Sequence, residues 1–187
     1  LGNYKLDGTE YSGSHPAVDI KIPEGTPVFS IANGTVIKVS NQTSGFGKHI
    51  VIQHNNFPNF DNPNIKEVIY SSYSHLGETL TEVGDTVSKG TQIALSGMTG
   101  TATTPHLHFQ IDNDSAPWHP FWPFTWSEIS EAGLSFFAAI NAGFGQSNAI
   151  TTTINPMKYV QKYLDPNAVL ATKVATIDNP AVSYVNE

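Results

Sequence analysis

Short apolar runs separated by turns fill the chain between residues 17 and 111. The runs are AVDIKI, TPVFSI, GTVIKVS, KHIVIQH, VIYSSYSH, DTVSKGTQIALSG and LHFQI. Regularly spaced runs of this kind are typical of an antiparallel sandwich or barrel. Asn33 and Gly34 form a hairpin signal between two of the runs, because both residues tolerate positive φ. The pattern predicts a mainly β fold, built as an antiparallel β-sandwich or a large twisted sheet with long loops.

Two segments depart from the strand pattern. Residues 55–66, NNFPNFDNPNIK, are rich in Asn and Pro and predict a long loop inserted into a hairpin. Residues 112–154 begin with an aromatic stretch and continue with a helical pattern, in which Ser127 fits an N-cap and Gly143 fits a C-terminal stop. We therefore expect one inserted helix at about 128–142, packed through one apolar face.

The end of the chain completes a single domain in this interpretation. The run NPMKYVQKYL at 155–164 predicts a short closing helix or turn. The tail at 165–187 shows no clear period, and no internal repeat is detected. We expect one domain over residues 1–187, a length sufficient to bury a core.

Charge and composition exclude several classes of function. The net charge is −7 with only 9 Lys and Arg among 187 residues, and no basic cluster is present, so nucleic acid is not an expected partner. No apolar run approaches the ~20 residues of a membrane span, and no targeting segment opens this chain. We expect a monomer. There is no cysteine, which leaves histidines and carboxylates as the strong ligands for a transition metal.

Two pairs of residues in the sequence have spacings that suit a metal site. His106 and His108 are two apart in TTPHLHFQI, and His15 and Asp19 are four apart in SHPAVDIKI. Residues at these separations share one face of a strand, and Pro16 keeps His15 out of a helix. Two imidazoles and one carboxylate match a catalytic zinc site with a fourth position left for water. With seven histidines in the chain, however, each pair is equally compatible with polar residues that are merely hydrogen-bonded in a strand.

Longer runs carry a resemblance to a known family. HPAVDIKIPEGTPVFSIANGTV, GFGKHIVIQH, YSHLGE, VGDTVSKGTQIALSGMTGTATTPHLHFQI and NPMKYVQKYL resemble the lysostaphin/LytM-type zinc metallopeptidases, which are peptidoglycan endopeptidases. Order and spacing match from about 13 to 111 and again near 155–164. The resemblance implies one LytM-type peptidase domain with one Zn²⁺ ion. It also implies peptidoglycan peptides as partners and an extracellular, periplasmic or cell-wall location.

The resemblance assigns a role to each matching residue. It implies that His15, Asp19 and His108 bind zinc, and that His75 and His106 flank the attacking water. Two positions depart from the family pattern without touching a ligand position. Ala17 stands where many relatives have glycine, and Gln110 stands where an acidic residue is common. The 112–154 segment is also larger than the connection expected in this family.

Substrate contacts can be proposed only from position. Tyr73 lies two residues before His75 and would share its face in a regular strand, where it could touch substrate or pack. Trp118 and Trp122 could form the wall of a substrate groove or anchor the inserted segment on the sheet, and anchoring is the favoured interpretation.

The remaining histidines are given non-catalytic roles. His54 closes a strand and is expected to be structural, whereas His49 and His119 are expected to be surface or loop groups.

The leading hypothesis is a zinc-dependent endopeptidase that hydrolyses peptide bonds in peptidoglycan stem peptides or cross-bridges by a metal-activated water. The chain has no H-E-x-x-H motif, so histidines must replace its glutamate base. The alternative is a non-enzymatic or latent LytM-like wall-binding protein that activates another hydrolase. It is weaker because every ligand position is filled. The run VGDTVSKGTQIALSG also resembles a biotinyl or lipoyl carrier hairpin, but Met98 has no lysine beside it.

Overall fold

The computed structural model describes residues 3–4, 10–11 and 13–163, and the 165–187 tail lies outside them. The strands are β1 (Asn3–Tyr4), β2 (Glu10–Tyr11), β3 (Val18–Ile20), β4 (Pro27–Phe29), β5 (Gly34–Asn41), β6 (Lys48–Pro58), β7 (Lys66–Thr79), β8 (Thr86–Val87), β9 (Gln92–Ser96), β10 (Leu107–Asn113) and β11 (Thr153–Ile154). The helices are α1 (Trp126–Glu131), α2 (Phe136–Asn141), α3 (Gln146–Thr152) and α4 (Pro156–Tyr163).

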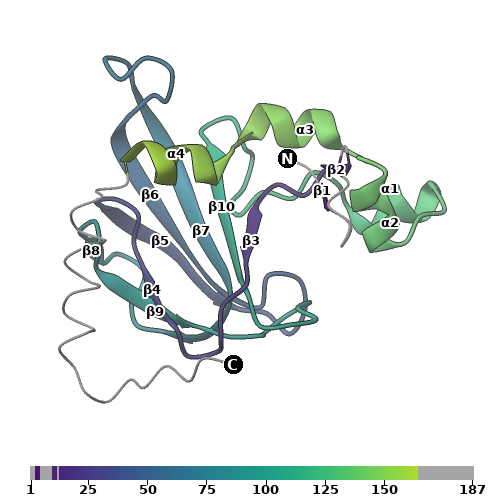
Figure 1. The fold of residues 1–187 in the computed structure, drawn as a ribbon, viewed down its shortest axis with the longest axis horizontal. Helices are drawn as coiled ribbons and strands as arrows, with labels where there is room; N and C mark the ends of the chain where they lie inside the picture. The colour runs from purple at the N-terminus through teal and green to yellow at the C-terminus, as the bar shows by residue number, and fades with distance from the viewer. Residues whose placement is uncertain (1–2, 5–9, 12, 164–187) are drawn as a thin grey trace, which may run out of the picture.

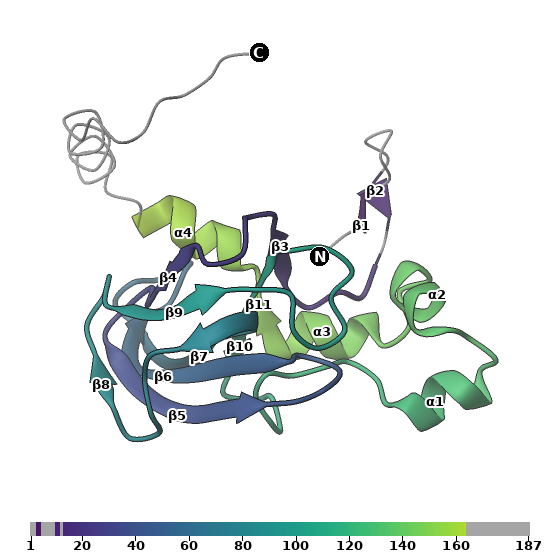
Figure 2. The same ribbon diagram turned by 90° about the horizontal axis from the view of Figure 1, so that it is seen from below.

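Nine of the described strands form one antiparallel sheet (Figure 1), which confirms the mainly β prediction. The order β11-β10-β7-β6-β5-β8 is its main path, β3 pairs with β10, and β9 joins β7 to β4. The sheet curls so that β4 and β9 lie over β6 and β7 (Figure 2). Between these layers lies the main apolar core, which includes Val28, Ile50, Ile52, Ile69, Tyr73, Leu76, Ile93 and Phe109.

Strand β10 separates the apolar core from the polar face of the sheet. Its residues Leu107, Phe109 and Ile111 belong to the core cluster, as the alternation in LHFQI predicts. The residues that alternate with them are His108, Gln110 and Asp112, which are also buried but point to the opposite face. The sheet therefore carries a second, polar interior on that face.

Strand β7 breaks the simple alternation at a β-bulge. Tyr73 and Leu76 both lie in the core although they are three residues apart, and the β6–β7 register shifts opposite them. Between them, His75 takes a φ of 60°, and this left-handed residue is turned to the other face. Tyr73 is only 1% exposed, and its hydroxyl accepts hydrogen bonds from Ile31 N (3.0 Å) and Ser71 Oγ (3.2 Å). The prediction that Tyr73 shares the face of His75 and could touch substrate is therefore wrong.

The inserted segment is helical, but the prediction of one helix at 128–142 is wrong. Thr125, not Ser127, caps α1, with Glu128 completing a capping box. Gly133, at a φ of 66°, follows the end of α1, and Ser135 caps α2. A left-handed glycine and a new N-cap thus divide the segment, because neither conformation continues a helix.

The other predicted irregular segments also become clear. Strand β6 extends to Pro58 and strand β7 begins at Lys66, so the predicted 55–66 loop is strand at both ends and irregular at its tip, residues 59–65. Helix α4 confirms the closing helix. Among the described helices, none has the length and apolar character that crossing a membrane requires.

Candidate metal centre and active-site pocket

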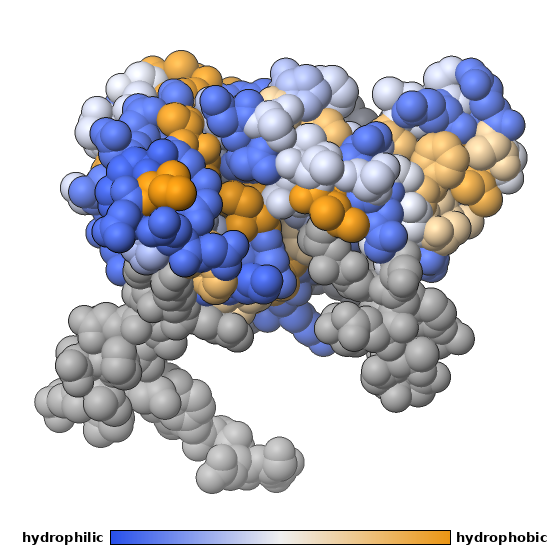
Figure 3. Space-filling model, turned by 90° about the horizontal axis from the view of Figure 1, so that it is seen from above, coloured by the Kyte–Doolittle hydropathy of each residue, from blue (hydrophilic) through white to orange (hydrophobic). Residues whose placement is uncertain are grey.

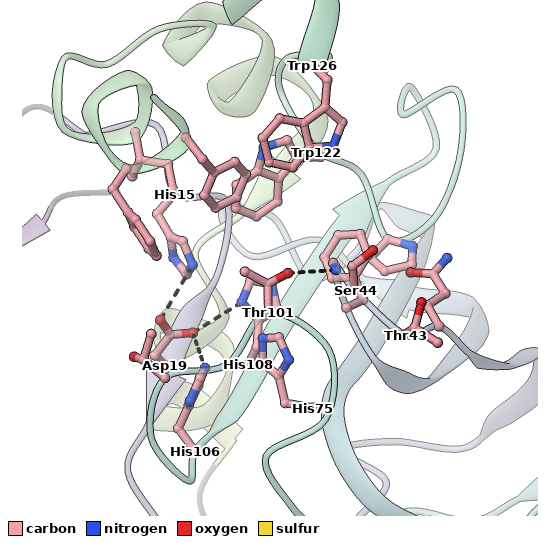
Figure 4. A pocket seen from close by; sticks show the side chains of 18 of the residues that line it. His15, Asp19, Thr43, Ser44, His75, Thr101, His106, His108, Trp122 and Trp126 are labelled. Carbon is pink, nitrogen blue, oxygen red and sulfur yellow. Dashed lines mark hydrogen bonds and ion pairs between the residues drawn. The ribbon is translucent and has the colours of Figure 1, made fainter. Parts of the chain in front are cut away.

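Strand register brings two of the predicted metal ligands together. Asp19 on β3 lies directly opposite His108 on β10, and opposite residues of an antiparallel pair have neighbouring side chains. His108 Nδ1 is 3.1 Å from Asp19 Oδ1, and His15 Nε2 is 3.5 Å from Asp19 Oδ2 (Figure 4). The three ligand atoms lie within 4.8 Å of one another. Two imidazole nitrogens and one carboxylate oxygen at these separations fit a single zinc ion, whose bonds to such ligands are about 2.0–2.2 Å.

His15 is held in an irregular segment immediately before β3. Its Nδ1 lies 3.1 Å from Ala17 O, to which it donates, so Nε2 is the nitrogen that faces Asp19. The preceding residue, Ser14, is fully buried, and its backbone N donates to Ile140 O of α2 (3.0 Å). The ring of His15 meets Trp122 edge-on, with ring centroids 5.8 Å apart. The inserted helices therefore help to fix the first ligand.

His75 and His106 form a pair next to these ligands, with ring centroids 4.7 Å apart. His75 Nδ1 lies 2.8 Å from Thr99 O, and His106 Nδ1 lies 2.7 Å from Thr104 O. A carbonyl oxygen can only accept, so each ring carries its hydrogen on Nδ1 and leaves Nε2 as an acceptor. His106 Nε2 is 3.7 Å from Asp19 Oδ1, which places one of these acceptors beside the ligand cluster.

Burial and the neighbouring imidazoles lower the pKa of His15 and of His75. Burial is the main cause that lowers the pKa of His15 to about 4, and the neighbouring His108 lowers it further. Burial likewise lowers the pKa of His75 to about 4. For Asp19, burial alone would raise the pKa, but the neighbouring His108, whose Nδ1 lies 3.1 Å from Oδ1, and the other nearby imidazoles outweigh it and hold the pKa below its usual range. At neutral pH His15 is therefore a neutral imidazole and Asp19 an ionised carboxylate, the protonation states that metal ligation needs.

The cluster forms the floor of a cavity of about 870 Å³. One wall is polar and comes from two loops, with Thr43, Ser44, Thr101 and Thr103 among its residues (Figure 4). The opposite wall is aromatic and comes from the inserted segment: Trp118, Trp122, Trp126, Phe136 and Phe137. Apolar residues also gather on the surface of the end that α1 and α2 form (Figure 3). A groove with one hydrogen-bonding wall and one apolar wall suits an extended peptide or a glycopeptide.

Trp118 and Trp122 both line the cavity, but they differ in packing. Trp122 stacks on Phe136 at 5.2 Å and lies 6.3 Å from the His108 ring, so it anchors the segment and borders the site at once. Trp118 is 52% exposed and contacts Phe121 at 5.4 Å. The two predicted alternatives, wall and anchor, therefore apply together to Trp122.

One of the remaining histidines differs from expectation. His49 is fully buried in β6 and is neither a surface nor a loop group, and its Nδ1 donates to Gly47 O at 3.0 Å. His119 lies in a loop, as predicted, where it stacks on Tyr70 at 3.6 Å. His54 is buried between Asn33 O and Ser71 Oγ, as a structural role predicts.

Sequence reasoning missed Gln110 and Asp112. Gln110 Oε1 is 3.2 Å from His108 Nε2, and Gln110 Nε2 donates to an oxygen of Asp112. A signal was available, because residues 108, 110 and 112 alternate with the apolar residues of HLHFQID and so must share one face.

Comparison with known proteins adds a family to this geometry. The model of Peptidase family M23 matches residues 13–120, which contain all five clustered residues but end before α1. An uncharacterized metalloprotease of Haemophilus influenzae is 40% identical over 97 residues, 52% of this chain and 18% of the relative. A peptidoglycan DD-endopeptidase of Vibrio cholerae is 35% identical over 103 residues, 55% of this chain and 21% of the relative. The matched part thus spans about a fifth of these relatives.

A solved structure extends the similarity over more of the chain. The antimicrobial peptidase lysostaphin from Staphylococcus simulans superposes with a TM-score of 0.54 at 26% identity, covering 90% of this chain and 51% of that one. The likeness supports the mainly β architecture with its large antiparallel sheet.

Proposed function

The chain belongs to peptidase family M23, and from this membership we propose that it is a zinc-dependent endopeptidase hydrolysing peptide bonds of peptidoglycan stem peptides or cross-bridges. One observation carries the proposal: His15, Asp19 and His108 converge at the floor of the same cavity that His75 and His106 line. The peptidoglycan endopeptidases among the relatives support the substrate class. Such a substrate also favours an extracellular, periplasmic or cell-wall location.

In this proposal His15, Asp19 and His108 hold the metal through Nε2, a carboxylate oxygen and Nδ1, the atoms that face one another. A zinc ion bound there supplies Lewis-acid chemistry, which strengthens water as a nucleophile and polarises a peptide carbonyl. The ionised Asp19 offsets part of the positive charge of the ion. Nδ1 of His15 remains bonded to Ala17 O, which fixes the ring orientation during turnover.

His75 and His106 move the proton. Each holds its own hydrogen on Nδ1 against a backbone carbonyl, and each leaves Nε2 free as an acceptor. The low pKa of His75 keeps that ring unprotonated at neutral pH and ready to accept. One of the two rings takes the proton of the attacking water through Nε2 and returns it to the leaving amine, and its partner, whose Nε2 is also an acceptor, orients the same water.

The substrate chain lies along the cavity between the two walls. Backbone amides of an extended peptide pair with the polar wall, and Trp118 and Trp122 contact the substrate from the aromatic side. Tyr73 takes no part, because its side chain lies in the core.

Three single substitutions test the division between ligands and proton carriers. We expect His108→Ala to lose both stoichiometric zinc and hydrolysis, because one of three ligands is removed. His75→Ala and His106→Ala should keep one zinc per chain but lose hydrolysis by about 10²–10⁴-fold, the usual contribution of a positioned acid or base. Zinc is counted by elemental mass spectrometry, and hydrolysis by mass analysis of fragments from sacculi and defined bridge peptides.

A zinc-loaded, monodisperse sample that leaves sacculi and several bridge peptides intact contradicts the enzyme proposal. In that case, stimulation of a separate hydrolase by the same sample supports the non-enzymatic alternative.

A further inference from the structure

A chain of buried polar groups continues from His108 away from the cavity. His108 Nε2 lies 3.2 Å from Gln110 Oε1, and Gln110 Nε2 reaches both an oxygen of Asp112 and Phe121 O (2.8 Å). The second oxygen of Asp112 lies 3.0 Å from both His119 Nδ1 and Phe121 N. Gln110 and Asp112 are completely buried.

The direction of each hydrogen bond in this chain follows from the acceptors. A backbone carbonyl only accepts, so Phe121 O requires the NH₂ group of Gln110, which also lies next to an oxygen of Asp112. The amide oxygen of Gln110 must then face His108. Because that oxygen also only accepts, the hydrogen of His108 must lie on Nε2.

We propose that Gln110 and Asp112 are positioning residues for the metal ligand His108: Asp112 fixes the amide of Gln110, and Gln110 fixes His108 with its hydrogen on Nε2 and Nδ1 open to the metal. The inference rests on the zinc site of the proposed function. His108 then carries its hydrogen on Nε2, whereas His15, His75 and His106 carry theirs on Nδ1 and donate it to backbone carbonyls. Without a fixed partner at Nε2, nothing in the strand would select the nitrogen that faces Asp19.

His119, at the far end of this series of hydrogen-bonded groups, is itself held in place. His119 stacks on Tyr70 with ring centroids 3.6 Å apart and 15° between planes, and its carbonyl oxygen accepts from Lys38 Nζ (3.0 Å). On β7, Ser74 and Ser72 lie opposite His108 and Gln110, so small side chains flank the bonded pair. Stability alone gives little reason for such a chain, because well-packed apolar residues can replace a buried polar pair at no net cost.

Asp112→Asn tests the proposal without changing the shape of the site. Phe121 N and His119 Nδ1 would keep the asparagine oxygen toward them, so its NH₂ would meet the NH₂ of Gln110. Phe121 O then holds the Gln110 NH₂ against that of the asparagine, so the amide loses its fixed orientation toward His108 and the hydrogen of His108 is no longer confined to Nε2. We expect zinc affinity to fall about 10- to 100-fold, the usual effect of losing such a partner, measured by chelator competition. Asp61→Asn, the same change at an exposed position on the β6–β7 hairpin tip, should leave affinity unchanged.

An Asp112→Asn variant that binds zinc like wild type overturns the proposal.

A measurement on the wild-type protein does not depend on whether a variant folds. Long-range ¹⁵N–¹H spectra of the zinc-loaded protein distinguish a metal-bound ring nitrogen from a protonated one. We expect His108 to carry its proton on Nε2 and His15 to carry its proton on Nδ1. A proton on His108 Nδ1 overturns the inference even if the protein hydrolyses peptidoglycan. The expected pattern in a protein without hydrolytic activity would overturn the proposed function alone.

Discussion

His75 shows how one residue can depend on two unusual features at once. It occupies a left-handed backbone conformation, and its backbone N donates to Phe46 O at 2.9 Å while its ring donates to Thr99 O. Such a conformation costs a non-glycine residue about 1–2 kcal/mol, so the surrounding bonds must stabilise it. The result is a buried imidazole that the bulge turns out of the core and toward the cavity.

Burial of His75 gives stability a defined pH dependence. The folded protein holds the pKa of this ring at about 4, compared with the usual 6.5, so below 6.5 the unfolded state binds more protons. Stability of the metal-free protein should therefore fall as pH drops from 6.5 to 4, by about 3 kcal/mol from this group. Urea unfolding across this range measures the slope. His75→Gln should flatten it, and equal slopes in both proteins would contradict the assignment.

At the residue scale, sequence spacing predicted which residues cluster around Asp19, but it misplaced Tyr73 and missed Asp112. His15, His106 and His108 all lie beside Asp19, although His15 and His106 precede the strands β3 and β10 in which period-two geometry holds. The placement of Tyr73 failed because the bulge at His75 changes the parity of β7, and no sequence period shows a bulge. Asp112 escaped notice although its period was visible, because an acidic residue after a strand also fits a surface turn.

At the element scale, two loops meet beside the site through glycines. The 45–47 and 99–101 segments are so close that a Cβ on Gly47, at a φ of 64°, would lie 2.5 Å from Thr99 O. That carbonyl is the acceptor that orients His75. The loops therefore directly support His75, the proposed proton carrier.

Gly47→Ala should disturb His75 while sparing the metal ligands. Thr99 must shift, so we expect hydrolysis to fall at least 10-fold, the scale of losing a positioned base, with one zinc per chain retained. Gly84→Ala is the matched control, because Gly84 has a φ of 100° but no atom within 4 Å of a new Cβ. Both variants should lose about 1 kcal/mol to backbone strain, seen in thermal unfolding, but only Gly47→Ala should lose activity. Equal activity losses would argue against the loop contact.

The strands were predicted correctly and the inserted helices were not, and the difference has physical causes. The strands of the sheet followed alternation because one face of each is buried in a common core. The inserted segment was wrongly joined into one helix because its apolar period continues across Gly133. A separate small core of Phe124, Ile129, Ala139 and Ile140 holds the divided helices together, and tertiary packing of that kind has no local signature.

At the scale of the whole molecule, a bound metal would join distant parts of the chain. Asp19 and His108 come from strands 89 residues apart, and His15 is tied to α2 through Ser14. An ion that binds only the folded chain stabilises it by about 2.7 kcal/mol at a free concentration 100 times the Kd. We expect zinc to raise the Tm and EDTA to reverse the rise, in scanning calorimetry. His108→Ala should show the same Tm with and without zinc, and a zinc-dependent Tm in that variant would place the ion elsewhere.

The inserted segment leaves the sheet and returns to it at one place. Asp112 on β10 pairs with Thr153 on β11, so residues 113–152 start and end on adjacent strands. The family match stops within this segment, which supplies the aromatic wall, while the proposed metal ligands belong to the matched part. The segment that forms the wall could therefore be exchanged as a unit, because both of its ends are fixed on paired strands. Grafting the equivalent connection from another M23 peptidase between Asp112 and Thr153 offers a route to combine the sheet that carries the proposed metal site with new cleavage specificities.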